Sequence, residues 1–303
     1  MIDFKPICPE SRNYFNKYLF GGTERGCEYS FANLFLWGRQ KAAFIFDHLV
    51  LFSQFNRQTV YPFPVGNGDK KPVLDAIIAD SKERGIPCRI TGLLKNDKDL
   101  LEELYPNKFH YHCDMGGFDY VYDINDLADL KGKKYHSKRN HYNKFLQTFP
   151  NLRIEEINAS NTNAVKKMVE EWYIKNESEN SKSDFLMEKV AIKKAIENRE
   201  NLGIFGLVLF NGETVLAITM GSKISHNTVD VHFEKALPGA EGAYAAINCE
   251  FANYIREKYP DIRFLDREED MGLEGLRKAK RSYRPHHMVE KCWACLKDDD
   301  YEY

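Results

Sequence analysis

Three ionisable side chains alternate with apolar ones along the segment from Thr228 to Lys235. Because successive side chains of a β-strand point to opposite faces, Asp230, His232 and Glu234 share one face of this predicted strand. An amine acceptor must lose a proton before it attacks an acyl carbon, and a nearby carboxylate or imidazole can accept that proton. We therefore predict Glu234 and His232 as catalytic residues and Asp230 as a substrate-binding residue. One alternative is that this strand face is solvated, and another is that the three polar groups satisfy neighbouring loops.

Two glycines, Gly239 and Gly242, open the helix that is predicted to follow this strand. The free N–H groups and the dipole at a helix N-terminus favour an anion such as a phosphate. Both glycines are therefore predicted to shape a donor-binding site. An ordinary turn with Gly242 as the helix cap is the alternative.

Charged residues follow directly after the predicted strand DIRFLD. Ligands of open α/β sheets bind beyond the carboxyl ends of the strands, so we predict that Arg267 and Glu268 bind substrate. For the acids that come next, Glu269 and Asp270, stabilising the start of the following helix is the alternative role. That helix carries cations, and the arginine fork suits phosphate best. The predicted donor-binding cations are Arg277, Lys280 and Arg281. A solvated helix face with basic residues near its C-terminal end is the alternative.

The stretch 131–149 contains no acid and predicts a basic amphipathic helix, with Tyr142 and Phe145 on its apolar side. Lys138 and Arg139 fall at the edges of the apolar stripe, so both are predicted to bind substrate. Cations interleaved with aromatic residues are compatible with an RNA backbone contact, whereas a solvated charged face is the alternative. The cations of this stretch are Lys131, Lys133, Lys134, Lys138, Arg139 and Lys144.

The elements that must position these residues are clearest in the second half of the chain. Its pattern predicts the order β-α-α-β-β-β-α-β-α-β, with Asn211-Gly212 as the turn of a hairpin and HMVEKCWACL as a single closing strand. A hairpin meander followed by crossover units predicts an α/β (α+β) fold with a mixed sheet flanked by helices. The first half shows a blurred version of the same order. We place the domain boundary at Pro150-Asn151, which gives domains 1–150 and 151–303, the second carrying the active site.

Two stretches, YDINDLADLKGKKYHSKRNHYNKF and LDREEDMGLEGLRKAKRSYRP, resemble the C-terminal catalytic domain of the bacterial phosphatidylglycerol lysyltransferases. That family is built from two tandem GNAT-like domains and is related to the Fem-type peptidyltransferases. The resemblance covers nearly the whole chain. It implies aminoacyl-tRNA as donor, with phosphatidylglycerol as the acceptor in the lipid-modifying members, and it implies that Tyr283 protonates a leaving group.

The chain departs from those enzymes and from CoA-dependent acetyltransferases in two places. Lipid-modifying members carry a multi-span membrane domain before the catalytic part, and this sequence has no apolar run of roughly 18 residues, the length that a span needs. The junction KALPGAEGAY places Gly239 and Gly242 at a spacing that differs from the pyrophosphate loop of CoA-dependent members. This spacing favours a donor other than CoA.

Composition excludes several other classes of protein. The 303 residues are 43% apolar and 29% charged, as in a soluble globular protein, and the net charge of −2 provides no global basic field for nucleic acid. Seven scattered cysteines and an N-terminus without a signal-peptide pattern predict reduced thiols in a cytoplasmic protein. Cys292 and Cys295 point to opposite faces of a strand, so no metal site is expected there.

Three functions remain open at this point. The first is a transferase that moves an aminoacyl group from aminoacyl-tRNA to an amine or hydroxyl of a small molecule, peptide or lipid. The second is a CoA-dependent N-acetyltransferase with acyl-CoA as donor. The third is a non-catalytic binding protein that keeps the fold. In the two enzymatic cases the acceptor attacks the activated carbonyl directly, because no convincing protein nucleophile stands out.

Overall fold

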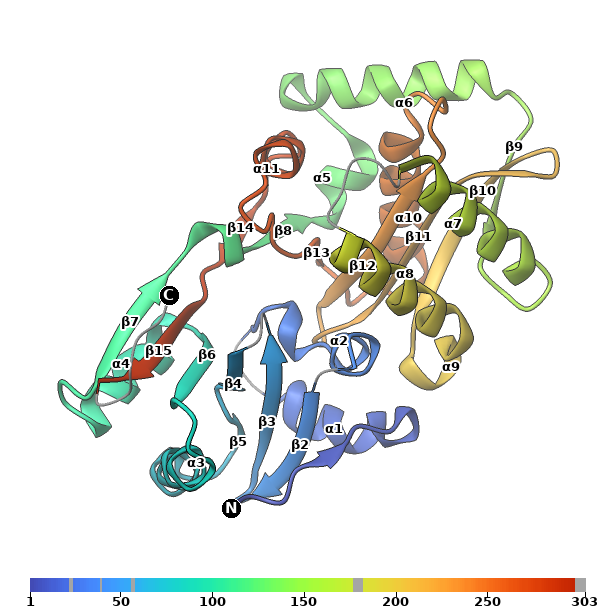
Figure 1. The fold of residues 1–303 in the computed structure, drawn as a ribbon. Helices are drawn as coiled ribbons and strands as arrows, with labels where there is room; N and C mark the ends of the chain where they lie inside the picture. The colour runs from blue at the N-terminus through green and yellow to red at the C-terminus, as the bar shows by residue number, and fades with distance from the viewer. Residues whose placement is uncertain (22–23, 39, 56–57, 177–181, 298–303) are drawn as a thin grey trace. The chain divides into compact units, whose positions relative to one another are not determined.

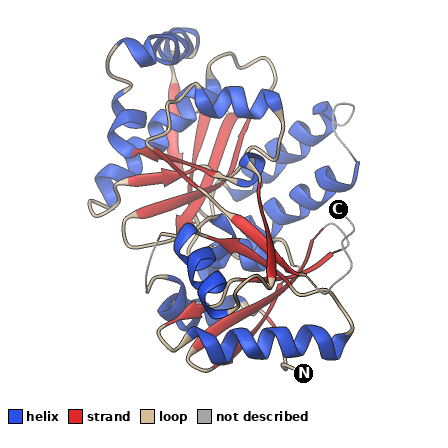
Figure 2. Cartoon of the chain, turned by 90° about the vertical axis from the view of Figure 1, so that its left-hand side faces the viewer, coloured by secondary structure: helices blue, strands red, loops and turns tan. Residues whose placement is uncertain are grey.

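The computed structural model describes residues 1–21, 24–38, 40–55, 58–176 and 182–297. The chain divides into two compact units, each with its own sheet (Figures 1 and 2). The first unit holds Met1–Asp119, Glu269–Glu274 and the residues from Met288 onward, and the second holds Tyr120–Glu268 and Gly275–His287. The basic stretch 131–149 therefore packs within the second unit, while the last strand packs within the first. The domain boundary at residue 150 stays a prediction.

The sheet of the first unit has the strand order β1-β2-β3-β4-β6-β15-β7, with β5 paired to β3. Its strands are β1 Lys5–Pro6, β2 Gln40–Ile45, β3 His48–Phe55, β4 Gln58–Pro62, β5 Val65–Gly66, β6 Arg89–Leu93, β7 Phe109–Cys113 and β15 Cys292–Leu296. Its helices are α1 Arg12–Leu19, α2 Phe31–Leu36, α3 Lys70–Arg84 and α4 Lys95–Leu104, with 3-10 turns η1 Pro9–Ser11, η2 Cys27–Tyr29 and η3 Met115–Gly117.

Helix α3 shows how local sequence sets an element of this unit. The Asp69 side chain accepts a hydrogen bond from Lys71 N at 3.0 Å and caps the start, and Gly85 ends the helix in a left-handed conformation with φ 66°. Together with the short strand β5 before it, the helix forms the connection from β4 to β6, which pair in parallel, as a crossover requires. Its buried Val73 and Ile77 join the core of this unit.

The sheet of the second unit has the order β14-β8-β13-β12-β11-β10-β9. Its strands are β8 Asp119–Asp123, β9 Leu152–Glu156, β10 Phe205–Asn211, β11 Thr214–Lys223, β12 Thr228–Ala236, β13 Phe264–Asp266 and β14 His287–Val289. Its helices are α5 Ile124–Asp129, α6 His136–Thr148, α7 Thr162–Asn176, α8 Lys182–Glu197, α9 Arg199–Leu202, α10 Ala243–Lys258 and α11 Glu274–Arg281, with the 3-10 turn η4 Lys133–Tyr135. In Figure 1, α7 and α8 lie in front of β10–β12 and α10 lies behind them, so both faces of these strands are covered.

Strand β12 has two irregularities that matter for the site. It pairs in parallel with β13 only over Thr228–Asp230, and the residues after Asp230 extend beyond that pairing. Against β11 the register runs from Phe233, opposite Met220, directly to Val231, opposite Gly221, so His232 is the extra residue of a β-bulge. Bulges re-aim side chains and occur often beside active sites.

The predicted α/β (α+β) class, the mixed sheets and the Asn211-Gly212 hairpin are confirmed. The single closing strand predicted over residues 287–296 is wrong. It divides into β14, in the second sheet, and β15, which lies between β6 and β7 in the first sheet. Among the described residues, no helix combines the length and the apolar character needed to cross a membrane.

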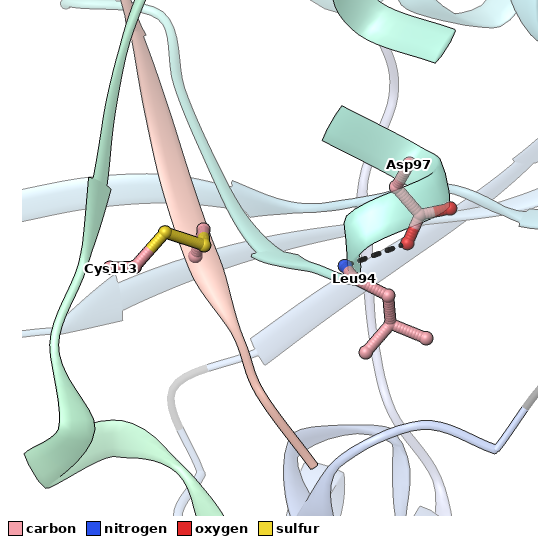
Figure 3. The surroundings of a disulfide bond; sticks show 4 residues. Leu94, Asp97 and Cys113 are labelled. Carbon is pink, nitrogen blue, oxygen red and sulfur yellow. Dashed lines mark hydrogen bonds between the residues drawn. A yellow bond between two sulfur atoms is a disulfide. The ribbon is translucent and has the colours of Figure 1, made fainter. Parts of the chain in front are cut away.

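The prediction that all seven cysteines are reduced is also wrong, because Cys113 and Cys292 form a disulfide (Figure 3). The register of β7 and β15 places the two residues opposite each other, with their Cα atoms 4.3 Å apart. In the same view the Leu94 N–H donates to the Asp97 side chain at 3.0 Å, which caps the start of α4.

Candidate functional site

Asp230 and His232 lie together inside the second unit. Asp230 is fully buried and His232 is 7% exposed, so the alternative of a solvated strand face is wrong. His232 Nδ1 lies 3.3 Å from Asp230 Oδ2 and 3.7 Å from Glu268 Oε1, with no aligned hydrogen bond of its own among the described residues. On the other side of the ring, Ser222 Oγ lies 2.8 Å from Nε2.

The surroundings of His232 favour its charged form. Burial alone would lower the pKa of His232, but the carboxylates of Asp230 and Glu268 more than offset burial and raise it to about 9. In this state the imidazole is protonated at neutral pH. It can therefore donate a proton or stabilise negative charge, but it does not act as a base there.

Glu234, Arg267 and Tyr283 form a second group in the same unit. Arg267 Nη2 donates to Glu234 Oε1 at 2.8 Å, and the Arg267 guanidinium lies over the Tyr283 ring at 4.9 Å from its centroid. Arg267 Nη1 is buried and has no hydrogen-bond partner among the described residues. Burial raises the pKa of Tyr283 to about 12, and the positive charge of Arg267 opposes that rise. The Tyr283 phenol therefore keeps its proton at neutral pH.

Lys138 completes this group from helix α6. Its Nζ lies 3.9 Å from the centroid of the Tyr283 ring. Burial, and then repulsion by the positive charge of Arg267, lowers the pKa of Lys138. The Tyr135 hydroxyl donates to the Tyr283 carbonyl at 3.1 Å, which ties η4 and the start of α6 to this part of the unit. The structure thus brings together two residues predicted as catalytic, Glu234 and Tyr283, and two predicted to bind substrate, Lys138 and Arg267.

Two predicted binding residues, Lys280 and Arg139, donate hydrogen bonds to backbone carbonyls. The Lys280 ammonium donates to the carbonyls of Arg267 and, at 3.1 Å, of Glu268, so it holds the backbone that presents those side chains. Lys280 is buried, and the alternative of a solvated face is wrong for it. Arg139 donates to the carbonyls of Leu130, which ends α5, and of Gly132.

The two predicted donor-site glycines differ in their surroundings. Gly242 is the N-cap of α10, and a Cβ there would lie 2.5 Å from the His141 carbonyl oxygen of α6. A Cβ at Gly239 would meet no atom of the described residues within 4 Å. Arg277 is half-buried and Arg281 is exposed, both on α11. A role of these four residues in donor binding stays a prediction.

Sequence reasoning missed Ser222, which orients the His232 ring. The only feature of the sequence that points to Ser222 is the glycine before it, Gly221. A Cβ at Gly221 would lie 2.5 Å from the Asp230 carbonyl oxygen, so this glycine marks a close approach of β11 to β12. It also missed a buried charged cluster in the first unit. There the Lys291 ammonium lies 2.8 Å from Asp119 Oδ1, and further contacts reach Glu28 at 2.9 Å, Glu269 at 3.3 Å and Cys27 Sγ at 3.8 Å.

A hollow of about 800 Å³ lies elsewhere in the first unit, beside β1 and β2, and is lined among others by Ile2, Tyr14 and Phe44. It is mostly apolar and contains none of the predicted site residues. We therefore place the chemistry at the polar groups of the second unit, because convergent charged side chains with shifted pKa values indicate a site better than volume does.

Residues 22–295 match the family described as phosphatidylglycerol lysyltransferase, C-terminal. The chain is similar to the crystal structure of a conserved protein of unknown function from Bacteroides thetaiotaomicron VPI-5482, with 38% identity and a TM-score of 0.92 over 98% of this chain and 100% of that one. It is also similar to L-PGS from Bacillus licheniformis, with 15% identity and a TM-score of 0.70 over 98% and 94% of the two chains.

FemX shares the fold at 11% identity, with a TM-score of 0.60 over 97% of each chain. A search of curated proteins gave no match. The chain thus shares its arrangement of two helix-flanked mixed sheets with L-PGS and FemX. The match across almost the whole sequence shows that the chain belongs to the phosphatidylglycerol lysyltransferase C-terminal family.

Proposed function

We propose that the chain transfers an aminoacyl group from aminoacyl-tRNA to an amine or hydroxyl acceptor. The observation that carries this proposal is the buried Nη1 of Arg267, which has no protein partner among the described residues. A buried guanidinium nitrogen normally finds an acceptor. In direct acyl transfer, the acyl carbonyl oxygen gains negative charge as the acceptor attacks, and a fixed cationic donor stabilises that charge.

The neighbouring side chains fit the remaining steps. Glu234, held by the other nitrogen of Arg267, takes a proton from the attacking amine or hydroxyl as its bond to the acyl carbon forms. Tyr283 gives its proton to the ribose oxygen as the ester bond breaks, and its raised pKa keeps that proton available. Lys138, above the Tyr283 ring, adds positive charge beside the leaving group. A proton returned from Glu234 to Tyr283 restores the starting state.

Three features support tRNA rather than CoA as the donor. The family resemblance implies aminoacyl-tRNA. Gly242 has a structural reason to be glycine, because α6 packs against the start of α10, so a CoA-binding loop is not needed to explain it. The basic stretch presents exposed cations, although three of them contact acids: Lys131 contacts Asp129, Lys134 contacts Asp126 and Lys144 contacts Glu241. We expect these exposed pairs to contribute little stability and to open when phosphate binds.

The test has a binding stage and a transfer stage. Thermal shifts of the full chain are measured with acetyl-CoA, with CoA and with a mixed aminoacyl-tRNA pool, at low and moderate salt. We expect salt-sensitive stabilisation by aminoacyl-tRNA only. Transfer is then followed as RNase-sensitive loss of labelled amino acid from tRNA in the presence of candidate amines and hydroxyl compounds.

Replacing Arg267 by Lys keeps the positive charge but removes the second nitrogen of the fork. We expect transfer to slow by about 10²–10³-fold, as for loss of one oxyanion donor. The exposed Arg263→Lys is the matched control and should transfer at the wild-type rate. Saturable stabilisation by CoA without a tRNA response would replace this proposal with a CoA-dependent N-acyltransferase. If no donor changes the melting temperature and no transfer occurs, a binding protein that keeps the fold is favoured.

A further inference from the structure

The side chains of Asp230, His232 and Glu268 converge on one point in the second unit. One ligand-type atom from each lies within 4.8 Å of the other two. We propose that these three residues bind a divalent transition-metal ion of the Zn²⁺ class. This proposal goes beyond the transfer chemistry and does not depend on it.

The distances within the cluster suit a metal ion better than a hydrogen bond. Nδ1 of His232 lies 3.3 Å from Asp230 Oδ2 and 3.7 Å from Glu268 Oε1. An N–H···O bond spans about 2.7–3.2 Å, so neither contact has that geometry. Two ligands of a tetrahedral ion with bonds of about 2.0–2.2 Å lie about 3.3–3.6 Å apart, which is close to both distances.

His232 Nδ1 is the second and independent observation. The His232 side chain is fully buried, and Nδ1 has no hydrogen-bond partner among the described residues although it faces two carboxylates. Ser222 Oγ lies 2.8 Å from the opposite ring nitrogen, Nε2. When a metal ion displaces the proton from Nδ1, Nε2 keeps its own proton and donates it to Ser222, and the lone pair of Nδ1 points to the space that it shares with the two carboxylates. Outer contacts of this kind orient metal-binding histidines.

The backbone around Glu268 is held in a way that presents its carboxylate. Glu268 has φ 58°, in the left-handed region that non-glycine residues rarely adopt. Its N–H donates to Asp266 Oδ1 at 2.8 Å, and its carbonyl accepts hydrogen bonds from Tyr120 N and the Lys280 ammonium, both at 3.1 Å. Strained residues that are held by several neighbours gather at functional sites.

Charge and ligand type identify the class of ion. Two carboxylates and a neutral imidazole carry a charge of −2, which a divalent ion neutralises within a buried site. An imidazole ligand favours zinc, copper, iron or nickel over calcium and magnesium, which prefer oxygen ligands. The similar group Cys27, Asp119 and Glu269 differs, because the Lys291 ammonium already contacts all three side chains there.

The test uses the tag-free full chain after chelation and dialysis. Co²⁺ is added while the visible absorption is followed, Zn²⁺ is used in competition, and the bound metal is counted by elemental analysis. We expect one ion per chain and a rise in melting temperature with Zn²⁺. Glu268→Gln and His232→Asn should lose the ion, whereas Glu269→Gln, changed at the adjacent position in the other cluster, should bind like the wild type.

Ser222→Ala keeps all three ligands and tests the site even if His232→Asn fails to fold. We expect it to bind about 10–100-fold more weakly while its circular dichroism stays that of the wild type. The proposal is overturned if the wild type binds no ion. It is equally overturned if binding survives both ligand substitutions, or if Glu269→Gln is the variant that abolishes binding.

Discussion

Arg267 and Glu234 form an ion pair in the second unit, with Arg267 Nη2 2.8 Å from Glu234 Oε1. Their side chains are only 15% and 11% exposed. The pair joins the end of β13 to the part of β12 that extends beyond its pairing with β13. It therefore fixes the distance between the two segments that carry most of the candidate site.

Breaking this pair from either side should be costly. Because one buried charge is left without its partner, we expect Arg267→Met and Glu234→Gln each to lower the free energy of unfolding by about 3–5 kcal/mol. The double variant Glu234→Gln with Arg267→Met should lose much less than the sum of the single losses. Chemical denaturation of the four proteins measures the coupling. The exposed pair Lys144–Glu241 is the control, and Lys144→Met should cost about 0–1 kcal/mol. Additive losses at Arg267 and Glu234 would contradict a coupled buried pair.

Lys291 should make stability depend on pH in a distinct way. Burial raises the pKa of Asp119 to about 6, and the Lys291 ammonium opposes that rise. The folded pKa lies above the unfolded value, so the Asp119 contribution to stability is largest at low pH and falls as the pH rises through 4 to 6. Lys291→Met removes the opposing charge and leaves the carboxylate buried. We expect a loss of about 3–5 kcal/mol at pH 8.

The same variant should lose clearly less at pH 5, because Asp119 is then protonated and needs no cation. Denaturation curves of the wild type and Lys291→Met at both pH values test this. The exposed Lys82→Met is the matched control and should show a small loss that does not change with pH. An equal loss for Lys291→Met at pH 5 and pH 8 would show that packing, rather than charge, explains its effect.

Alternation along residues 228–236 was enough to predict β12 and the grouping of Asp230 with His232, because a polar and apolar period of two is a local property of the chain. The bulge at His232 was not predictable, since it arises from the register against β11 and from the close approach at Gly221. Glu268 was predicted from its place after a strand. Its left-handed backbone depends on Lys280 and Tyr120, which are distant from it in sequence.

The predicted closing strand shows most clearly what the sequence alone does not determine. Residues 287–296 are mostly apolar, with only Glu290 and Lys291 between the two apolar parts, yet β14 and β15 pair in different sheets. Which strands they join depends on edges formed by β8, β6 and β7. For the same reason the cluster around Lys291 could not be predicted, because its members come from residues 27–28, 119, 269 and 291.

The disulfide predicts a specific thiol count. The chain has seven cysteines, and five of them keep their thiols outside the disulfide: Cys8, Cys27, Cys88, Cys249 and Cys295. Thiol titration after unfolding without reductant should therefore find five thiols, and reduction should raise the number to seven. Cys113→Ser with Cys292→Ser should lower stability by about 2–5 kcal/mol, because the bond closes a loop across a sequence separation of 179 residues. Seven thiols without reductant would show that β7 and β15 pair without the bond.

Gly239 and Gly242 offer a matched pair, because both have positive φ, 91° and 86°, but only Gly242 is crowded. Replacing either by Ala should cost about 1–2 kcal/mol for a left-handed backbone. At Gly242 the new methyl group would also press on the His141 carbonyl oxygen and on Phe145 Cβ, 3.0 Å away, and such overpacking adds about 1–3 kcal/mol. Thermal and chemical denaturation of Gly239→Ala and Gly242→Ala measure the difference. If the two losses are equal, α6 is able to shift, and the contact between α6 and the start of α10 is not what requires glycine at position 242.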